Sequence, residues 1–144
     1  MIVLLDAGPL GLISNPKAME IANECREWMR GQTARGVRFC LPEIVDYEVR
    51  RELLRGNKVR GLARLDLLKS SIWYLPITTP VMEKAAELWA DVRRRGMPTA
   101  DPKALDCDVI LAAQALAVNG VVATENVGHL ARFVTARHWR DMAS

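Results

Sequence analysis

The chain opens with "MIVLLDAGPLG" (residues 1–11), and the first half of this stretch predicts the class of fold. The run "IVLL" (residues 2–5) is apolar without alternation and ends in turn-forming residues. This pattern is typical of a short strand buried on both faces of a parallel sheet. Asp6 falls where that strand ends. Taken alone, the aspartate could simply start the turn by bonding its own backbone.

The rest of the chain alternates between helical and strand patterns. We expect helices at residues 16–31, 42–56 with a continuation at 62–69, 79–96 and 107–120, the first capped by Ser14 or Asn15, and strands at 37–41, 71–78 and 121–124. Residues 97–106 read as a polar loop, and the tail after residue 124 is less regular. Strands alternating with helices predict an α/β fold, with three α/β/α layers around a central parallel sheet, formed by a single domain over residues 1–144.

Composition restricts the function classes without choosing among them. The net charge is +3 with a pI near 9.0, and 15 of the 20 basic residues are arginine, whose planar fork suits phosphate. The three cysteines are widely spaced and contain no C-x-x-C pair, so we expect neither a disulfide framework nor a zinc site. No apolar run approaches the roughly 18 residues that span a bilayer, and the first residues do not resemble a signal peptide. A cytoplasmic protein without a membrane partner is the simplest interpretation.

In "PEIVDYEVRRELL" (residues 42–54), two glutamates fall on the face of the helix that carries its apolar residues. Steps of about 100° per residue place Glu48 and Glu52 in that arc, whereas Glu43, Asp46 and Arg50 fall outside it and are expected in solvent. A carboxylate on a core-facing stripe is costly unless it is paired, neutralised or bound to a metal. Pairing with a neighbouring arginine is the structural alternative.

A further pair of acids begins the apolar helix "CDVILAAQALAV" (residues 107–118). Asp106 is placed to cap this helix, which leaves Asp108 in excess of what capping requires. The parallel strand that follows ends in Thr124, Glu125 and Asn126, at the same sheet edge as Asp6. Hard oxygen ligands of this kind suit Mg²⁺ or Mn²⁺ rather than zinc.

At these residues the chain resembles the PIN-domain nucleases, in particular the small VapC-like ribonucleases that act as toxins of bacterial toxin–antitoxin pairs. The matching segments are "LLDAGPL", "VDYEVRREL", "DVILAAQA" and "VVATENV", which span most of the chain in the order and spacing of the family. The resemblance implies a Mg²⁺- or Mn²⁺-dependent endoribonuclease that leaves a 5′-phosphate and a 3′-hydroxyl. It also implies a homodimer and an antitoxin partner.

Residue by residue, the resemblance assigns the metal-binding acids and their support. It makes Asp6, Glu48 and Asp108 the catalytic, metal-binding acids, Thr124 a supporting residue, Asp106 and Asn126 further candidate ligands, and Arg50, Arg51 and Arg55 candidate contacts to RNA.

Two departures from the family pattern leave alternatives open. Many relatives carry a fourth acid near this strand end, where this chain has Asn126 and, further on, His129. A competing register selects Glu52 in place of Glu48. A catalytically degenerate PIN fold that serves as a nucleic-acid-binding or assembly module is therefore the main rival. A haloacid-dehalogenase-like phosphatase would need a second aspartate where this chain has Gly8.

Overall fold

The computed structural model describes residues 1–96 and 102–142, and in the second range the side chains from residue 107 onward. Its centre is a five-stranded sheet of order β3-β2-β1-β4-β5, in which every strand pair is parallel. The strands are β1 (Ile2–Leu5), β2 (Arg38–Pro42), β3 (Trp73–Leu75), β4 (Val121–Thr124) and β5 (Ala136–His138). This arrangement confirms the predicted α/β class with a central parallel sheet.

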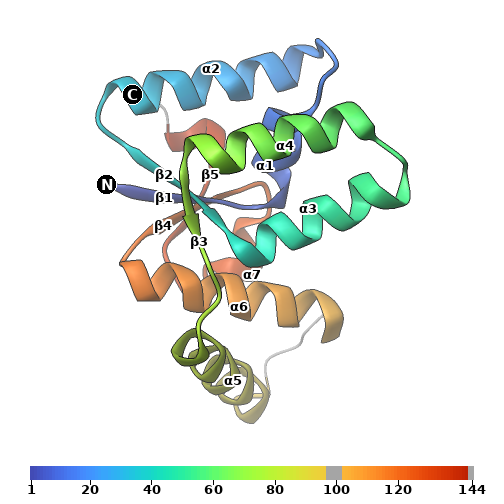
Figure 1. Ribbon diagram of the computed structural model, residues 1–144. Coiled ribbons are helices and arrows are strands. Elements are labelled where there is room, and N and C mark those ends of the chain that lie inside the picture. Colours follow the sequence, from blue (N-terminus) through green and yellow to red (C-terminus); the bar gives the residue numbers. More distant parts are fainter. Residues whose placement is uncertain (97–101, 143–144) are drawn as a thin grey trace.

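Helices cover both faces of the sheet and complete three layers (Figure 1). The described helices are α1 (Ala7–Ser14), α2 (Glu20–Ala34), α3 (Glu43–Arg55), α4 (Val59–Ser71), α5 (Thr79–Arg94), α6 (Pro102–Val118), α7 (Val127–Leu130) and a short 3₁₀ helix (Trp139–Met142). In Figure 1, α2 and α4 lie above the sheet, and α5, α6 and α7 lie below it. Helix α3 contacts α1, α4 and α6, so it links the two layers beside the sheet. None of the described helices combines the length and the apolar composition that crossing a bilayer requires.

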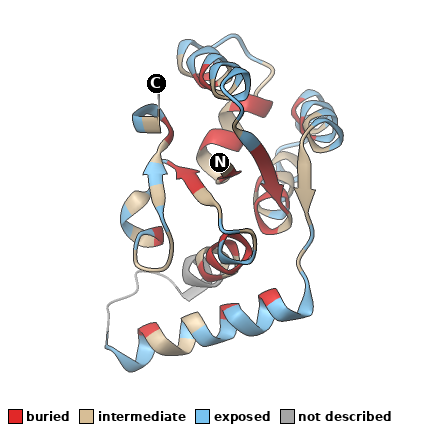
Figure 2. Ribbon diagram, turned by 90° about the vertical axis from the view of Figure 1, so that its left-hand side faces the viewer, coloured by how far each residue is buried: buried red, intermediate tan, exposed pale blue. Residues whose placement is uncertain are grey.

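The order of the strands explains why the first strand reads as a continuous apolar run. β1 lies between β2 and β4, with Leu4 opposite Cys40 on one side and Val122 on the other. Leu4 and Leu5 are fully buried, as are Val122 and Ala123 in β4. Figure 2 shows the buried residues on the central strands and on the helix faces that pack against them. A strand covered on both faces has no solvent side, so polar residues do not alternate along it.

The first helix was missed by the sequence interpretation. Asp6 is followed by α1, and the helix expected to start near Ser14 or Asn15 begins at Glu20 instead. The segment "AGPLGLIS" (residues 7–14) carries no amphipathic stripe because several of its positions are buried and its glycines blur the helical pattern.

Two further differences lie in the second half of the chain. Helix α6 begins at Pro102, inside the expected loop, so Asp106 and Asp108 are inside the helix and neither caps it. Residues 97–101 of that expected loop lie outside the described residues. The tail that looked irregular contributes α7 and the edge strand β5.

Candidate active site

Asp6 stands at the carboxyl end of the central strand and both of its oxygens accept hydrogen bonds. The backbone N–H of Asp6 donates to the Ala123 carbonyl (2.9 Å), which fixes this end of β1 to β4. Oδ1 accepts from the N–H of Ala7 (2.8 Å) at the start of α1, and Oδ2 accepts from Thr124 Oγ1 (2.7 Å). Burial raises the pKa of Asp6, while these two hydrogen bonds act in the opposite direction. The carboxylate is therefore held in one orientation at the sheet edge.

Thr124, the last residue of β4, connects the two strand ends. Its side chain is fully buried, and its Oγ1 both donates to Asp6 and accepts from the backbone N–H of Asn126 (2.9 Å). Thr124 thus lies at the same sheet edge as Asp6, as the sequence predicts, and the hydrogen bond joins the two side chains. The exposed Asn126 begins α7 without a side-chain capping bond.

Glu48 approaches Asp6 from α3 and Asp108 approaches it from α6. Burial, and then the negative charges of Asp6 and Asp108, raise the pKa of Glu48 to about 7. Burial and the charge of Asp6 raise the pKa of Asp108 to about 6. Three carboxylates from three separate elements thus act on one another, and we call Asp6, Glu48 and Asp108 the acid cluster.

The structure distinguishes Glu48 from Glu52. Glu52 is exposed and forms an ion pair with Arg55, which lowers its pKa. The expectation that Glu52 faces the core is wrong, since its side chain is exposed and paired with Arg55. The side chain of Asp106 lies outside the described residues.

Two charges expected in solvent are instead part of the packing around α3. Asp46 is 6% exposed and pairs with Arg50 (3.0 Å) and with Lys69 (3.8 Å). Glu43 accepts hydrogen bonds from the Tyr74 hydroxyl (3.0 Å) and from the backbone N–H of Ile77 (2.7 Å). The helical wheel was wrong for both because α3 has a second packed side, formed by α4 and β3.

The three arginines proposed to contact RNA have different surroundings. Arg50 is engaged by Asp46 and Asp66, and Arg55 by Glu52. Arg51 is exposed, lies over the Tyr47 ring at 5.0 Å, and its charge lowers the pKa of the neighbouring Glu48. Of the three, Arg51 is the one directed at the acid cluster.

Sequence reasoning missed Arg132 next to the acid cluster, and it placed Glu125 and His129 after the strand end without giving either a role in the site. The charges of His129 and Arg132 lower the pKa of Asp108. Glu125 raises the pKa of Asp6, and its side chain lies 3.0 Å from the position that a Cβ atom on Gly8 would occupy. The only available signal was their position just after the strand that ends at Thr124.

The chemistry of the acid cluster fits a hard divalent cation. Carboxylate oxygens with a supporting hydroxyl are the ligands that Mg²⁺ and Mn²⁺ prefer, and a cation would offset the burial and the repulsion that raise the pKa values of Glu48 and Asp108. Across the side chains that the structure describes, no three histidine, cysteine or acidic groups already converge in the geometry of a metal cage. The acids are thus close enough to shift one another's pKa values, but their side chains do not yet converge on one point.

Comparisons with known proteins agree with this fold. A family model described as the PIN domain matches residues 16–133. Among solved structures, VapBC2 from Rickettsia felis, bound to a DNA fragment from its promoter, superposes with a TM-score of 0.75 at 18% identity, covering 96% of this chain and 99% of that one. FitAcB from Neisseria gonorrhoeae gives a TM-score of 0.71 at 20% identity, covering 97% and 99% of the two chains. The sarcin-ricin loop cleaving toxin VapC20 from Mycobacterium tuberculosis gives 0.65 at 13% identity, covering 92% and 96%. No curated protein matches the chain significantly.

Proposed function

The chain belongs to the PIN domain family, and from that premise we propose that it is a Mg²⁺- or Mn²⁺-dependent endoribonuclease. The proposed substrate is RNA and the proposed reaction is hydrolysis of a phosphodiester bond. Asp6, Glu48 and Asp108 are the proposed catalytic residues, through the metal that they would hold.

The observation that carries the proposal is the acid cluster itself. Burial raises the pKa of all three carboxyls, and the charge of Asp6 raises the pKa of Glu48 and Asp108 further, so the fold keeps negative charges together at a cost. Acids with perturbed pKa values in a shared site are typical of functional positions, because packing alone would select apolar residues there.

Each residue of the site has a proposed task. A bound divalent cation supplies the acidity that activates a water molecule and the positive charge that stabilises phosphoryl oxygens. Thr124 and the N–H of Ala7 hold the two Asp6 oxygens in place, so that this ligand is oriented before the cation arrives. Arg51, exposed beside Glu48, is placed to donate to a non-bridging phosphate oxygen. Neither histidine is required.

Cleavage of defined single-stranded RNAs tests the proposal. Purified protein, free of any partner, is incubated with Mg²⁺, with Mn²⁺ or with a chelator, beside Asp6→Asn, Asp108→Asn and the control Asp91→Asn on α5. We expect cleavage that requires metal, falls at least about 100-fold in the two site variants and is unchanged in the control. Metal-dependent cleavage that survives in both site variants would refute the assignment. RNA binding without any cleavage would favour the degenerate binding module.

The toxin role and the assembly are separate parts of the proposal. The solved structures named above include antitoxin complexes of other VapC-like proteins, which supports an antitoxin partner for this chain. Expression of the wild type without a partner should arrest growth, and Asp108→Asn should not. Growth unaffected by the wild type would remove the toxin role and leave the nuclease untouched. A homodimer predicts twice the chain mass in light scattering, and a single chain mass would contradict it.

A further inference from the structure

A groove of about 900 Å³ runs from the acid cluster along α3 to the turn between α3 and α4, with the end of α1 as its other wall. We propose that this groove binds the nucleotides that flank the cleaved bond in a single-stranded RNA, an inference that rests on the proposed nuclease function. Their phosphates would contact a cationic rim formed by Lys17, Lys58 and Arg60. The strand would therefore leave the acids in one defined direction.

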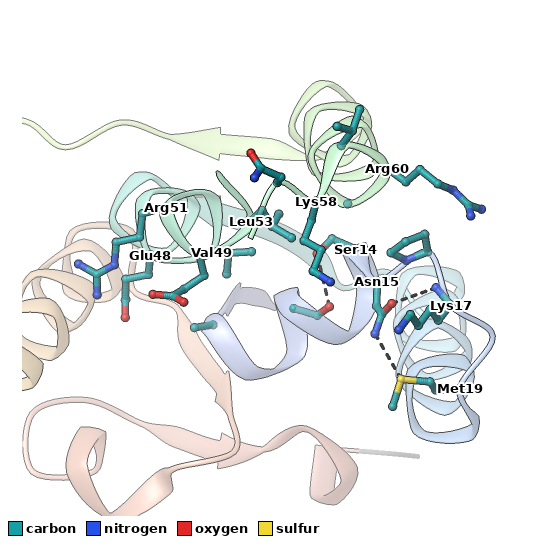
Figure 3. A pocket seen from close by; sticks show the side chains of 17 residues that line it. Ser14, Asn15, Lys17, Met19, Glu48, Val49, Arg51, Leu53, Lys58 and Arg60 are labelled. Atoms are coloured by element: carbon teal, nitrogen blue, oxygen red, sulfur yellow. Dashed lines mark hydrogen bonds between the residues drawn. The ribbon is translucent and has the colours of Figure 1, made fainter. Parts of the chain in front are cut away.

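The groove is continuous with the acid cluster. Glu48 lines one end, and Ala7, the residue after Asp6, lines the same space. Figure 3 shows Glu48 and Arg51 at one end, with Lys17, Lys58 and Arg60 toward the other. A phosphate at the acid cluster thus has an open path for the adjoining chain.

Charge along the groove is complementary to a polyanion. Lys17, Lys58 and Arg60 are exposed, and within the described ranges none of the three forms an ion pair with a carboxylate. The acid Glu52 also lines the groove, but Arg55 neutralises it. Unpaired cations along a path toward a catalytic site favour a phosphate backbone, because each phosphate contact releases condensed counterions.

The lining of the groove indicates how an RNA strand would be held. Val49 and Leu53 provide an apolar floor, while the described residues around it include no aromatic ring. Bases could pack on this floor but could not stack on a ring, so phosphate contacts would dominate affinity and base preference would be weak. Strong dependence of binding on salt is the expected signature.

The wall at the α3–α4 turn is closely packed. A Cβ atom on Gly61 would lie 2.8 Å from Leu53 Cδ2, so glycine allows α4 to approach α3 at this point. Lys58 is the N-cap residue of α4 and Arg60 lies in its first turn, directly after a tight turn in which Asn57 adopts a φ of 53°. Their backbone positions are therefore fixed before any ligand binds.

A charge-matched pair of triple variants tests the groove. The first is Lys17→Gln with Lys58→Gln and Arg60→Gln. The second is Arg93→Gln with Arg94→Gln and Arg95→Gln, which removes three exposed cations at the end of α5, on the opposite side of the sheet. Both are made with Asp108→Asn, so that RNA is bound without being cut. Affinity for a fluorescent single-stranded RNA is measured by anisotropy between low and moderate salt.

We expect the groove triple to weaken binding at least about 10-fold at low salt. Its slope of log affinity against log salt should fall by about 2, since each phosphate contact on a single strand contributes about 0.7. The α5 triple should keep the slope. An unchanged slope in the groove triple would overturn the proposal, whether the groove is then empty or holds a protein segment. Equal losses in both triples would also overturn it, because net charge alone would explain them.

Cleavage by the same triples with Asp108 intact separates this proposal from the nuclease proposal. A wild type that cleaves RNA, with a groove triple that binds RNA normally, would refute the groove and leave the nuclease standing. A wild type that cuts nothing, with a groove triple that loses affinity and slope, would refute the nuclease and leave an RNA-binding groove.

Discussion

Replacing Glu48 by glutamine should stabilise the metal-free protein. Burial and the charges of Asp6 and Asp108 raise the pKa of Glu48 from 4.5 to about 7. Ionised Glu48 is therefore less stable in the folded protein than in the unfolded chain, so above pH 7 its negative charge lowers the free energy of unfolding. A neutral amide of nearly the same shape removes that opposition and keeps the packing of α3.

The pKa displacement sets the size of this effect. At about 1.4 kcal/mol for each pKa unit, the full displacement from 4.5 to about 7 corresponds to at most about 3.5 kcal/mol. Glu48 is partly open to solvent, which screens its charge, so we expect about 1–2 kcal/mol. For a domain of this length that is an increase of about 3–8 °C in Tm.

Thermal unfolding in a chelator at pH 8 measures the change. Glu48→Gln should melt above the wild type, and the difference should shrink as the pH falls from about 7 toward 4.5. In that window the folded wild type holds a proton that the unfolded chain has released, so wild-type stability decreases as the pH rises through it. The control Glu52→Gln, which removes only an exposed pair with Arg55, should stay within about 0.5 kcal/mol.

In saturating Mg²⁺ the wild type should melt at a higher temperature than Glu48→Gln, the reverse of their order in chelator. The wild type gains stability from binding, whereas the glutamine variant loses a charged ligand and gains less. A variant that melts below the wild type in chelator at pH 8 would refute the electrostatic reasoning.

Three other substitutions test the packing around the site by chemical denaturation. Thr124→Val removes the hydroxyl that donates to Asp6 and should cost about 1–3 kcal/mol, with Thr124→Ser restoring most of it; equal losses in both would contradict the role of that hydrogen bond. Asp46→Ala leaves Arg50 without its buried partner and should cost about 2–4 kcal/mol, and a loss below 0.5 kcal/mol would place this pair with ordinary surface salt bridges. Gln114→Leu removes the fully buried amide that donates to the Leu75 carbonyl (2.8 Å) and should cost about 1–3 kcal/mol, whereas unchanged stability would argue against that contact.

The sequence could predict the positions of residues that lie at the carboxyl ends of the parallel strands. An apolar run followed by an aspartate predicts a buried parallel strand, and the carboxyl ends of parallel strands meet at one edge. Asp6 and Thr124 are 118 positions apart, yet this rule brings them together and the structure joins them by a hydrogen bond.

Sequence patterns could not predict the burial of residues on a helix that packs on more than one side. A helical wheel assumes one buried face, but α3 packs against α1, α4 and α6, so Glu43 and Asp46 are partly or fully buried despite their position outside the apolar arc. Helix α1 has the opposite problem, because a short, mostly apolar segment with two glycines has no polar face to reveal its period. In both cases the missing information is tertiary.

The cations of the groove were missed for a related reason. Lys17 follows α1, whereas Lys58 is the N-cap residue of α4 and Arg60 lies in its first turn, and nothing in their local sequence indicates that they face one space. The sequence analysis selected arginines of α3 as the RNA contacts instead, although two of the three, Arg50 and Arg55, form ion pairs with acidic residues.

Binding of Mn²⁺ to the metal-free protein, followed by electron paramagnetic resonance, tests the central claim that the acid cluster is one divalent-metal site. Asp6→Asn, Glu48→Gln and Asp108→Asn should each weaken Mn²⁺ at least about 10-fold, because each removes a charged ligand, and Glu52→Gln should bind as the wild type does. Mg²⁺ should displace the bound Mn²⁺. A wild type that leaves Mn²⁺ free in solution, or site variants that bind it as well as the wild type, would contradict the claim.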